Sequence, residues 1–302
     1  MFKNVRFGQP PVRFGAPAYP VAVADNSTVQ DSSYGPSCIQ ASVQDKLANA
    51  PRPPPGGEES EDCLFLDVYV PTWVLEPDAP LLPVVVYFHG GAYIFGSKDA
   101  TFKDISFYDG QSVMDVSGGG LIWVVGNYRL GAYGFLAGDT MEKLGTPNAA
   151  LHDQRLLLQW VRDYIGQVSG DKEAVTAWGH SAGAGSLLHH LTAYGGKQNP
   201  LFHQAVLLSP TYQWASDRSG ALERTFKQLV RDTDCGAAQG GEFECLRKTS
   251  NKTLKDANQA IVDQTYKHGL LPFGPAVDGS WVPKLATTSL NQSMYSSSLI
   301  KS

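Results

Sequence analysis

The sequence has no long apolar run and no excess of basic charge. Its 302 residues carry a formal net charge of -5, whereas a nucleic-acid partner would require a basic face. No apolar run reaches the length of a transmembrane helix, so no transmembrane segment is expected. The stretch Met1 to Arg6 also lacks the apolar core of a signal peptide. Because 42% of the residues are hydrophobic, the composition favours a globular protein with a sizeable core.

Cysteine is scarce, and none of the cysteines forms a C-x-x-C pair. The cysteines are Cys38, Cys63, Cys235 and Cys245. Without such a pair no zinc or other metal site is expected, and four cysteines leave three disulfide pairings open. The chain also contains N-x-S/T sequons at Asn26, Asn251 and Asn291. Disulfides and sequons together favour the secretory route.

The stretch Gly179-His180-Ser181-Ala182-Gly183 fits the G-x-S-x-G nucleophile elbow. Residues 174–178 before it are typical of a short buried strand, and residues 182–194 after it are typical of a helix. In such a turn the serine hydroxyl is exposed at the top of a sheet, and the glycines allow close backbone approach. On the pentapeptide alone, a plain glycine-rich turn is the competing interpretation, and the strand–helix context favours the elbow.

The hydrophobic pattern predicts an α/β fold. Strands are expected at 64–70, 83–88, 121–125 and 205–208, and a helix is expected at 151–165. Strands alternating with helices in this order indicate a mostly parallel central sheet flanked by helices. Residues 1–60 are rich in proline and lack periodicity, and we expect them to form an extended surface wrap rather than part of the core.

A second motif, His89-Gly90-Gly91-Ala92, follows the predicted strand 83–88 directly. A loop of this kind supplies backbone N–H donors for an oxyanion hole, and the residue after the serine supplies another, here Ala182. Small residues are needed because the substrate oxygen must approach the backbone closely. Both motifs together, in this order, predict a hydrolase with Ser181 as its nucleophile.

The chain resembles the type-B carboxylesterase/lipase family, which includes cholinesterases and fungal extracellular lipases. The resemblance runs from about Phe2 to about Pro283 and leans towards the fungal lipases. Its motifs are residues 61–68 (EDCLFLDV), 127–136 (NYRLGAYGFL), 153–155 (DQR) and 273–279 (FGPAVDG). It implies an α/β-hydrolase fold in one domain over residues 1–302, ester hydrolysis without a cofactor, and a small-molecule or lipid ester as substrate. It leaves the oligomeric state open.

The same resemblance implies several structural pairs. Cys38 would pair with Cys63, and Cys235 with Cys245. Arg13–Glu61 and Arg129–Asp153 would be ion pairs that support the architecture rather than the chemistry.

The resemblance also predicts what the chain lacks. In the family the order is Ser, then an acid, then His, and this chain departs from it after Ser181. The elbow has His180 where the family usually has Glu. His189 and His190 fall on the elbow helix and are expected to be structural; His203 and His268 do not match the family's motif. No catalytic acid or histidine is therefore assigned, and the chain is interpreted as the N-terminal portion of its domain. The alternatives are a non-catalytic relative that binds a partner and a partial gene model.

Overall fold

The computed structural model describes most of the chain. The described residues are 1–20, 34–43, 50–54, 57–102, 105–213, 215–266 and 271–296. Asn26 and His268 lie outside them.

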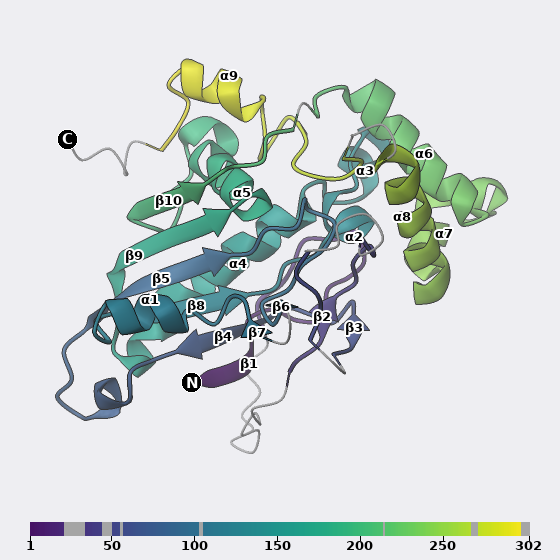
Figure 1. The fold of residues 1–302 in the computed structure, drawn as a ribbon. Coiled ribbons are helices and arrows are strands. Elements are labelled where there is room, and N and C mark those ends of the chain that lie inside the picture. Colours follow the sequence, from purple (N-terminus) through teal and green to yellow (C-terminus); the bar gives the residue numbers. More distant parts are fainter. Residues whose placement is uncertain are drawn as a thin grey trace.

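A six-stranded sheet with the order β1-β4-β8-β5-β9-β10 forms the centre of the molecule (Figure 1). Its strands are β1 (Phe2–Arg6), β4 (Phe65–Tyr69), β5 (Leu82–Phe88), β8 (Ile122–Gly126), β9 (Gly170–His180) and β10 (Gln204–Leu208). The four strands from β8 to β10 run parallel, whereas β1 and β4 are antiparallel to their neighbours. Two short ribbons accompany the sheet: β2 (Ser37–Cys38) with β3 (Glu59–Ser60), and β6 (Thr101–Phe102) with β7 (Ile105–Ser106).

The two longest helices near the sheet cover one of its faces, and a short helix lies on the other (Figure 1). The helices are α1 (Gln111–Val116), α2 (Gly131–Phe135), α3 (Asp139–Leu144), α4 (Ala149–Tyr164), α5 (Ala182–Leu191), α6 (Glu223–Asp232), α7 (Glu242–Lys248), α8 (Asn251–Tyr266) and α9 (Ala286–Asn291). Side chains of α4 and α5 pack with Val84, Val86 and Val124 in one core, while Val113 and Met114 of α1 pack with Val85 and Tyr87 on the opposite face. We call these the covered face and the open face.

The predicted strands, the two predicted helices and the mostly parallel sheet are confirmed. The prediction for residues 1–60 was wrong in part. Phe2–Arg6 forms the edge strand β1, which pairs with β4, and both Phe7 and Phe14 are buried in the core. The strand was missed because a single five-residue strand within a proline-rich segment gives too few residues for a periodic pattern.

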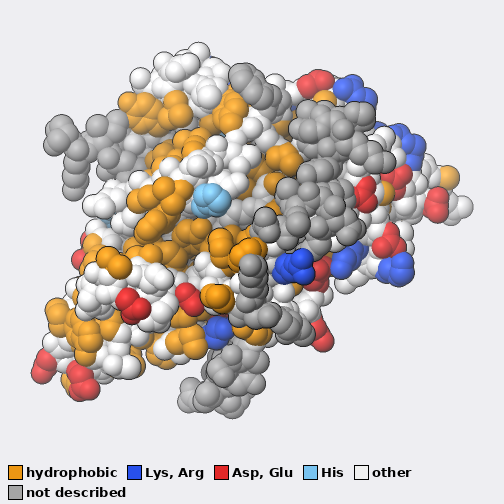
Figure 2. Space-filling model, viewed as in Figure 1, with side chains coloured by type: hydrophobic (Ala, Val, Ile, Leu, Met, Phe, Trp, Pro, Cys, Tyr) orange, Lys and Arg blue, Asp and Glu red, His pale blue; other side chains and the backbone are white. Residues whose placement is uncertain are grey.

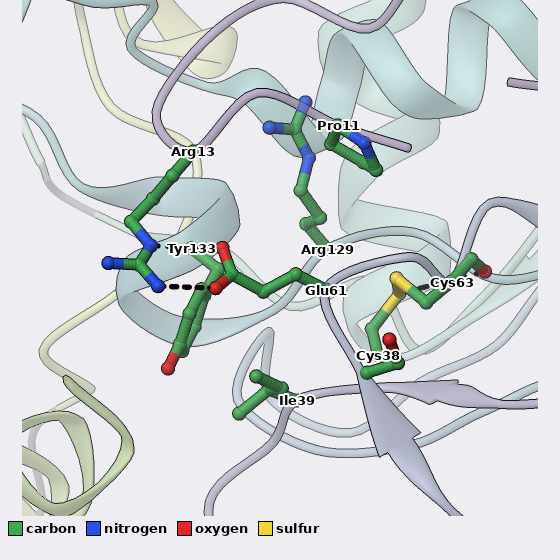
Figure 3. A pocket seen from close by; sticks show the side chains of 9 residues that line it. Pro11, Arg13, Cys38, Ile39, Glu61, Cys63, Arg129 and Tyr133 are labelled. Atoms are coloured by element: carbon green, nitrogen blue, oxygen red, sulfur yellow. Dashed lines mark hydrogen bonds and ion pairs between the residues drawn. A yellow bond between two sulfur atoms is a disulfide. The ribbon is translucent and has the colours of Figure 1, made fainter. Parts of the chain in front are cut away.

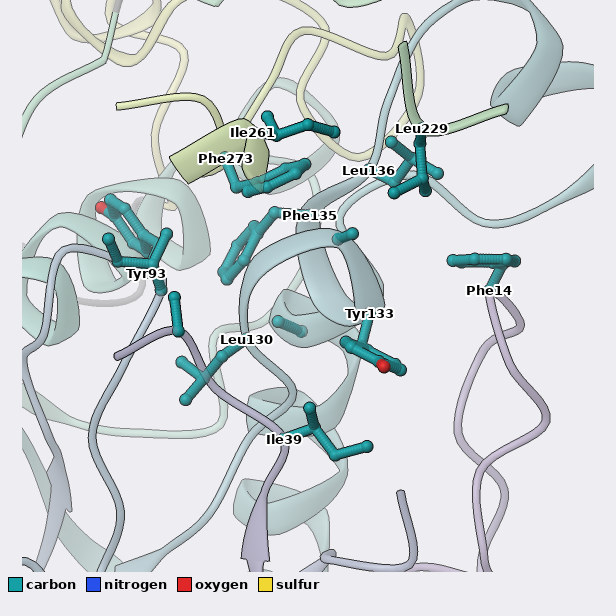
Figure 4. Packing of buried hydrophobic residues seen from close by; sticks show 14 of the residues in the cluster. Phe14, Ile39, Tyr93, Leu130, Tyr133, Phe135, Leu136, Leu229, Ile261 and Phe273 are labelled. Carbon is teal, nitrogen blue, oxygen red and sulfur yellow. The ribbon is translucent and has the colours of Figure 1, made fainter. Parts of the chain in front are cut away.

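A second core lies beyond the ends of the strands, between α2 and helices α6 and α8 (Figure 4). Phe135 of α2, Leu229 of α6 and Ile261 of α8 meet there, together with Phe273 from the loop that follows α8. Tyr93 directly follows residues 89–92, which we call the glycine loop, and it belongs to the same cluster. Its ring meets the Phe135 ring edge-on, with the centroids 5.1 Å apart. This core therefore anchors the glycine loop from behind.

Both predicted disulfides are present. Cys38 and Cys63 have a Cα–Cα distance of 5.0 Å, and Cys235 and Cys245 one of 5.6 Å. The first disulfide joins the segment that contains β2 to the residues just before β4.

The two ion pairs are confirmed as well. Arg13 Nε donates to Glu61 at 3.0 Å beside a small pocket next to the Cys38–Cys63 disulfide (Figure 3). Arg129 makes a bidentate pair with Asp153, at 2.8 and 2.7 Å, and both side chains are buried. These contacts tie the N-terminal segment and the loop after β8 to the rest of the fold.

Candidate active site

Ser181 occupies a strained turn between β9 and α5. Its φ of 53° and ψ of -118° lie in a region that a residue with a side chain rarely adopts. Backbone hydrogen bonds hold it there. The Ser181 N–H donates to the carbonyl of Leu208 at 2.9 Å, and its own carbonyl accepts from Gly185 and Thr211 at 2.9 and 3.0 Å. Strain held by surrounding contacts is typical of functional positions.

Close packing explains the two glycines of the elbow. A Cβ atom added to Gly179 would lie 2.5 Å from the backbone of Gly183, and one added to Gly183 would lie 2.0 Å from the carbonyl oxygen of Phe88. Any side chain at either position would push α5 away from β9 or β5. The glycines therefore bring the start of α5 against the end of β5.

The glycine loop after β5 lies beside Ser181. Strands β5 and β9 pair in parallel with Phe88 opposite Gly179, so their carboxyl ends meet at one edge of the sheet. A Cβ atom added to Gly90 would lie 3.1 Å from the Ser181 Cβ. Gly91 and Ala92 both have positive φ, 119° and 54°, which turns the loop sharply. The two motifs found in the sequence thus meet at one place.

His89 holds this loop in shape. Its Nδ1 lies 2.8 Å from the carbonyl oxygen of Gly90, and its ring stacks on Tyr128 with centroids 4.3 Å apart. The Tyr128 hydroxyl donates to the His89 carbonyl at 2.6 Å. Complete burial lowers the pKa of His89 to about 4, so the ring is neutral at pH 7. A neutral ring that keeps its proton on Nδ1 donates to the Gly90 carbonyl and fixes that peptide group.

In the described part of the chain, the side-chain partner of the Ser181 hydroxyl is Thr211, with the two oxygens 3.0 Å apart. The sequence did not reveal Thr211, because it belongs to no motif. The one feature of the sequence that could have pointed to Thr211 is its position just after the strand 204–208. Leu208 pairs in parallel with His180, so the residues just after this strand must lie near Ser181.

None of the described histidines takes the place of a catalytic base beside Ser181. His189 and His190 are buried in α5, where His190 Nε2 lies 3.0 Å from Gln154 Oε1. His203 lies just before β10, at the opposite end of this strand from Leu208, and Leu208 is the end that lies near Ser181. The length of the strand therefore places His203 about 16 Å from Ser181. His268 lies outside the described residues, and its role stays open.

The described residues hold neither a candidate membrane span nor a candidate metal cluster. None of their helices is both long and apolar enough to span a membrane. Their His, Cys, Asp and Glu side chains form no group of three or more that could hold a metal ion.

A mostly parallel sheet with a nucleophile elbow after one of its parallel strands, β9, and a glycine loop beside it defines the α/β-hydrolase fold. The Carboxylesterase family matches residues 1–300, and the chain belongs to this family.

Among relatives, the secreted lipase of Arthroderma benhamiae is 39% identical over 271 residues, covering 89% of this chain and 51% of the relative. Lipase 2 of Geotrichum candidum is also 39% identical, over 75% of this chain and 41% of its own. The structure of Aspergillus niger EstA superimposes with a TM-score of 0.79 at 32% identity, covering 97% of this chain and 54% of that one. The chain therefore spans about half the length of the relatives it matches.

Proposed function

We propose that the chain contributes the nucleophile and the oxyanion hole of a carboxylic ester hydrolase. Ser181 Oγ attacks the ester carbonyl carbon and forms a C–O bond, while the hydroxyl proton passes to a general base. The carbonyl oxygen becomes an oxyanion, the alcohol leaves with a proton, and water then hydrolyses the acyl-serine. The base is an imidazole from outside the described residues.

The oxyanion is assigned to backbone N–H groups of the two motifs: Gly91, Ala92 and Ala182, with Gly90 as a further candidate. Ala182 is the first residue of α5, where N–H groups have no partner within the helix and the helix dipole favours negative charge. The observation that carries the proposal is the parallel pairing of β5 with β9, because it brings both motifs to the same edge. Removing one such donor typically costs about 3 kcal/mol of barrier.

Hydrolysis of p-nitrophenyl butyrate by the 302-residue chain and its Ser181→Ala variant tests this proposal. Without a base beside Ser181, its hydroxyl is a weak nucleophile at neutral pH, so its attack on the ester is slow. We therefore expect a slow rate that Ser181→Ala abolishes. A rate that Ser181→Ala leaves unchanged would refute the assignment of the nucleophile. A fast serine-dependent rate would place the base within this chain, and His268 would be the residue to substitute.

The substrate class and the secretory route form part of the same proposal. Relatives named as lipases and as carboxylesterases support a small-molecule or lipid ester, and they give no support to a non-catalytic binding protein. Secreted relatives and two disulfides support secretion. Asn251 and Asn291 are exposed, as N-glycosylation requires. Expression in a secreting yeast should give a chain whose mass falls on treatment with peptide N-glycosidase; an unchanged mass would remove glycosylation from the proposal.

A further inference from the structure

Thr211 is placed against the nucleophile by backbone contacts on both sides of its side chain. Its N–H donates to the Ser181 carbonyl at 3.0 Å, and its own carbonyl accepts from the Tyr93 hydroxyl at 3.3 Å. Gly185 of α5 leaves room for this second contact. A Cβ atom there would lie 2.2 Å from both the Tyr93 hydroxyl and the Thr211 carbonyl oxygen.

Tyr93 connects this contact to the glycine loop. Its side chain is only 1% exposed and packs in the second core (Figure 4), while its backbone carbonyl accepts from Gly131 at 2.8 Å. Tyr93 directly follows Ala92, so a single buried residue links the proposed oxyanion loop to Thr211. The Thr211 hydroxyl, 3.0 Å from Ser181 Oγ, is therefore held by the same framework that holds the loop.

We infer that Thr211 is a further catalytic residue, whose hydroxyl donates to Ser181 Oγ as that oxygen loses its proton. With both hydroxyls protonated, either oxygen can be the donor. Once Ser181 Oγ has given its proton to the base, only Thr211 still has a hydrogen to donate. A hydrogen bond to a charged oxygen is shorter and stronger than one between neutral groups. The interaction therefore strengthens as negative charge builds on the nucleophile, which is the condition for accelerating the reaction.

A thiol at the nucleophile position tests this without any need for esterase activity. All four cysteines of the chain are paired in disulfides, so Ser181→Cys introduces a single free thiol. Iodoacetamide alkylates the thiolate, forming an S–C bond and releasing iodide, so the pH midpoint of the alkylation rate reports the thiol pKa. Three proteins are compared: Ser181→Cys alone, with Thr211→Val, and with Thr211→Ser.

A hydrogen bond to the thiolate from Thr211 should make the midpoint of Ser181→Cys about one pH unit lower than that of Ser181→Cys/Thr211→Val. Thr211→Ser keeps a hydroxyl and should restore the low midpoint. Equal midpoints in all three proteins, or a lower midpoint with Thr211→Val, would overturn the inference. Circular dichroism confirms that each variant is folded.

The consequence for catalysis rests on the proposed function. In the chain with Ser181 intact, Thr211→Val should lower the serine-dependent kcat about tenfold with little change in KM, and Thr211→Ser should recover it. The two proposals fail separately. Absence of serine-dependent hydrolysis refutes the proposed function and leaves the thiol midpoints to decide on Thr211. An unchanged kcat in Thr211→Val overturns the catalytic role of Thr211 even where Ser181 is required.

Discussion

The covered and open faces of the sheet are built from alternate residues of the same strands, and the open face is the less completely buried of the two. On the covered face Val84, Val86 and Val124 are 0% exposed beneath α4 and α5. On the open face α1 is the packing helix, and Trp178 of β9 is only partly buried. Leu208, at the end of the edge strand β10, is 44% exposed. Figure 2 shows apolar side chains gathered in a broad band over this side of the molecule.

This difference shows which parts of the site are held by buried contacts. Ser181 and the glycine loop lie where the strands end, and their supports come from α5, from the second core and from the covered face. Along β9, His180 and Trp178 point towards the open face, whereas Ala177 points towards the covered face. The His180 side chain is exposed. Ser181 and the glycine loop are thus held in place from within, whereas the exposed His180 lies on the open side of the site.

The largest effect is expected on the covered side, at the pair between Arg129 and Asp153 of α4. Asp153→Asn leaves the Arg129 charge buried without its carboxylate, which should lower the free energy of unfolding by about 4 kcal/mol. Asp163→Asn is the matched control, because its pair with Arg162 is exposed and should change stability by less than about 1 kcal/mol. Urea unfolding measures both. Similar losses in the two variants would contradict the claim that the buried pair is structural.

The buried histidines of α5 should make stability depend on pH. Burial lowers the pKa of His189 to about 4 and that of His190 to about 3, whereas the pKa of an unfolded histidine is about 6.5. Below about pH 6.5 the unfolded chain therefore binds protons that the folded protein does not. The free energy of unfolding should fall as pH drops from about 6.5 towards 4, by about 1.4 kcal/mol per pH unit for each histidine.

His190→Gln should remove one histidine's share of this dependence. Urea unfolding between pH 7 and pH 5 gives the two slopes. A variant that loses stability as steeply as the unaltered chain would show that His190 is not held neutral by burial.

The smallest expected effect is the difference in stability between alanine substitutions at two neighbouring residues of β5. Val86→Ala removes packing on the covered face and should cost about 2 kcal/mol, whereas Val85→Ala, on the open face, should cost about 1 kcal/mol. Thermal unfolding of the two variants is enough to compare them. An equal or larger loss in Val85→Ala would mean that the open face is packed as firmly as the covered one.

The sequence was sufficient to predict the parallel sheet, the elbow and the glycine loop. Each depends on local patterns: runs of β-branched residues for strands, and glycines where backbones approach within contact distance, as at Gly183 against Phe88. Both disulfides were predicted through the family resemblance, since their spacing alone left three pairings open.

The sequence was not sufficient where a role depends on tertiary contacts. Strand β1 exists because it pairs with β4, about 60 residues away, and its own five residues have no distinctive pattern. Thr211 and Tyr93 meet beneath α5 because Gly185 leaves space there, which no local motif expresses. Likewise, the distance that separates His203 from Ser181 follows from the parallel register of β9 and β10.

Covalent labelling shows directly whether Ser181 is a nucleophile held beside an oxyanion hole. A fluorophosphonate probe forms an Oγ–P bond with such a serine and releases fluoride, and peptide mass spectrometry locates the adduct. We expect slow labelling at Ser181 and at no other serine, with none in the Ser181→Ala variant. A folded chain that is labelled elsewhere, or that remains unlabelled at Ser181 after prolonged exposure to the probe, would contradict it.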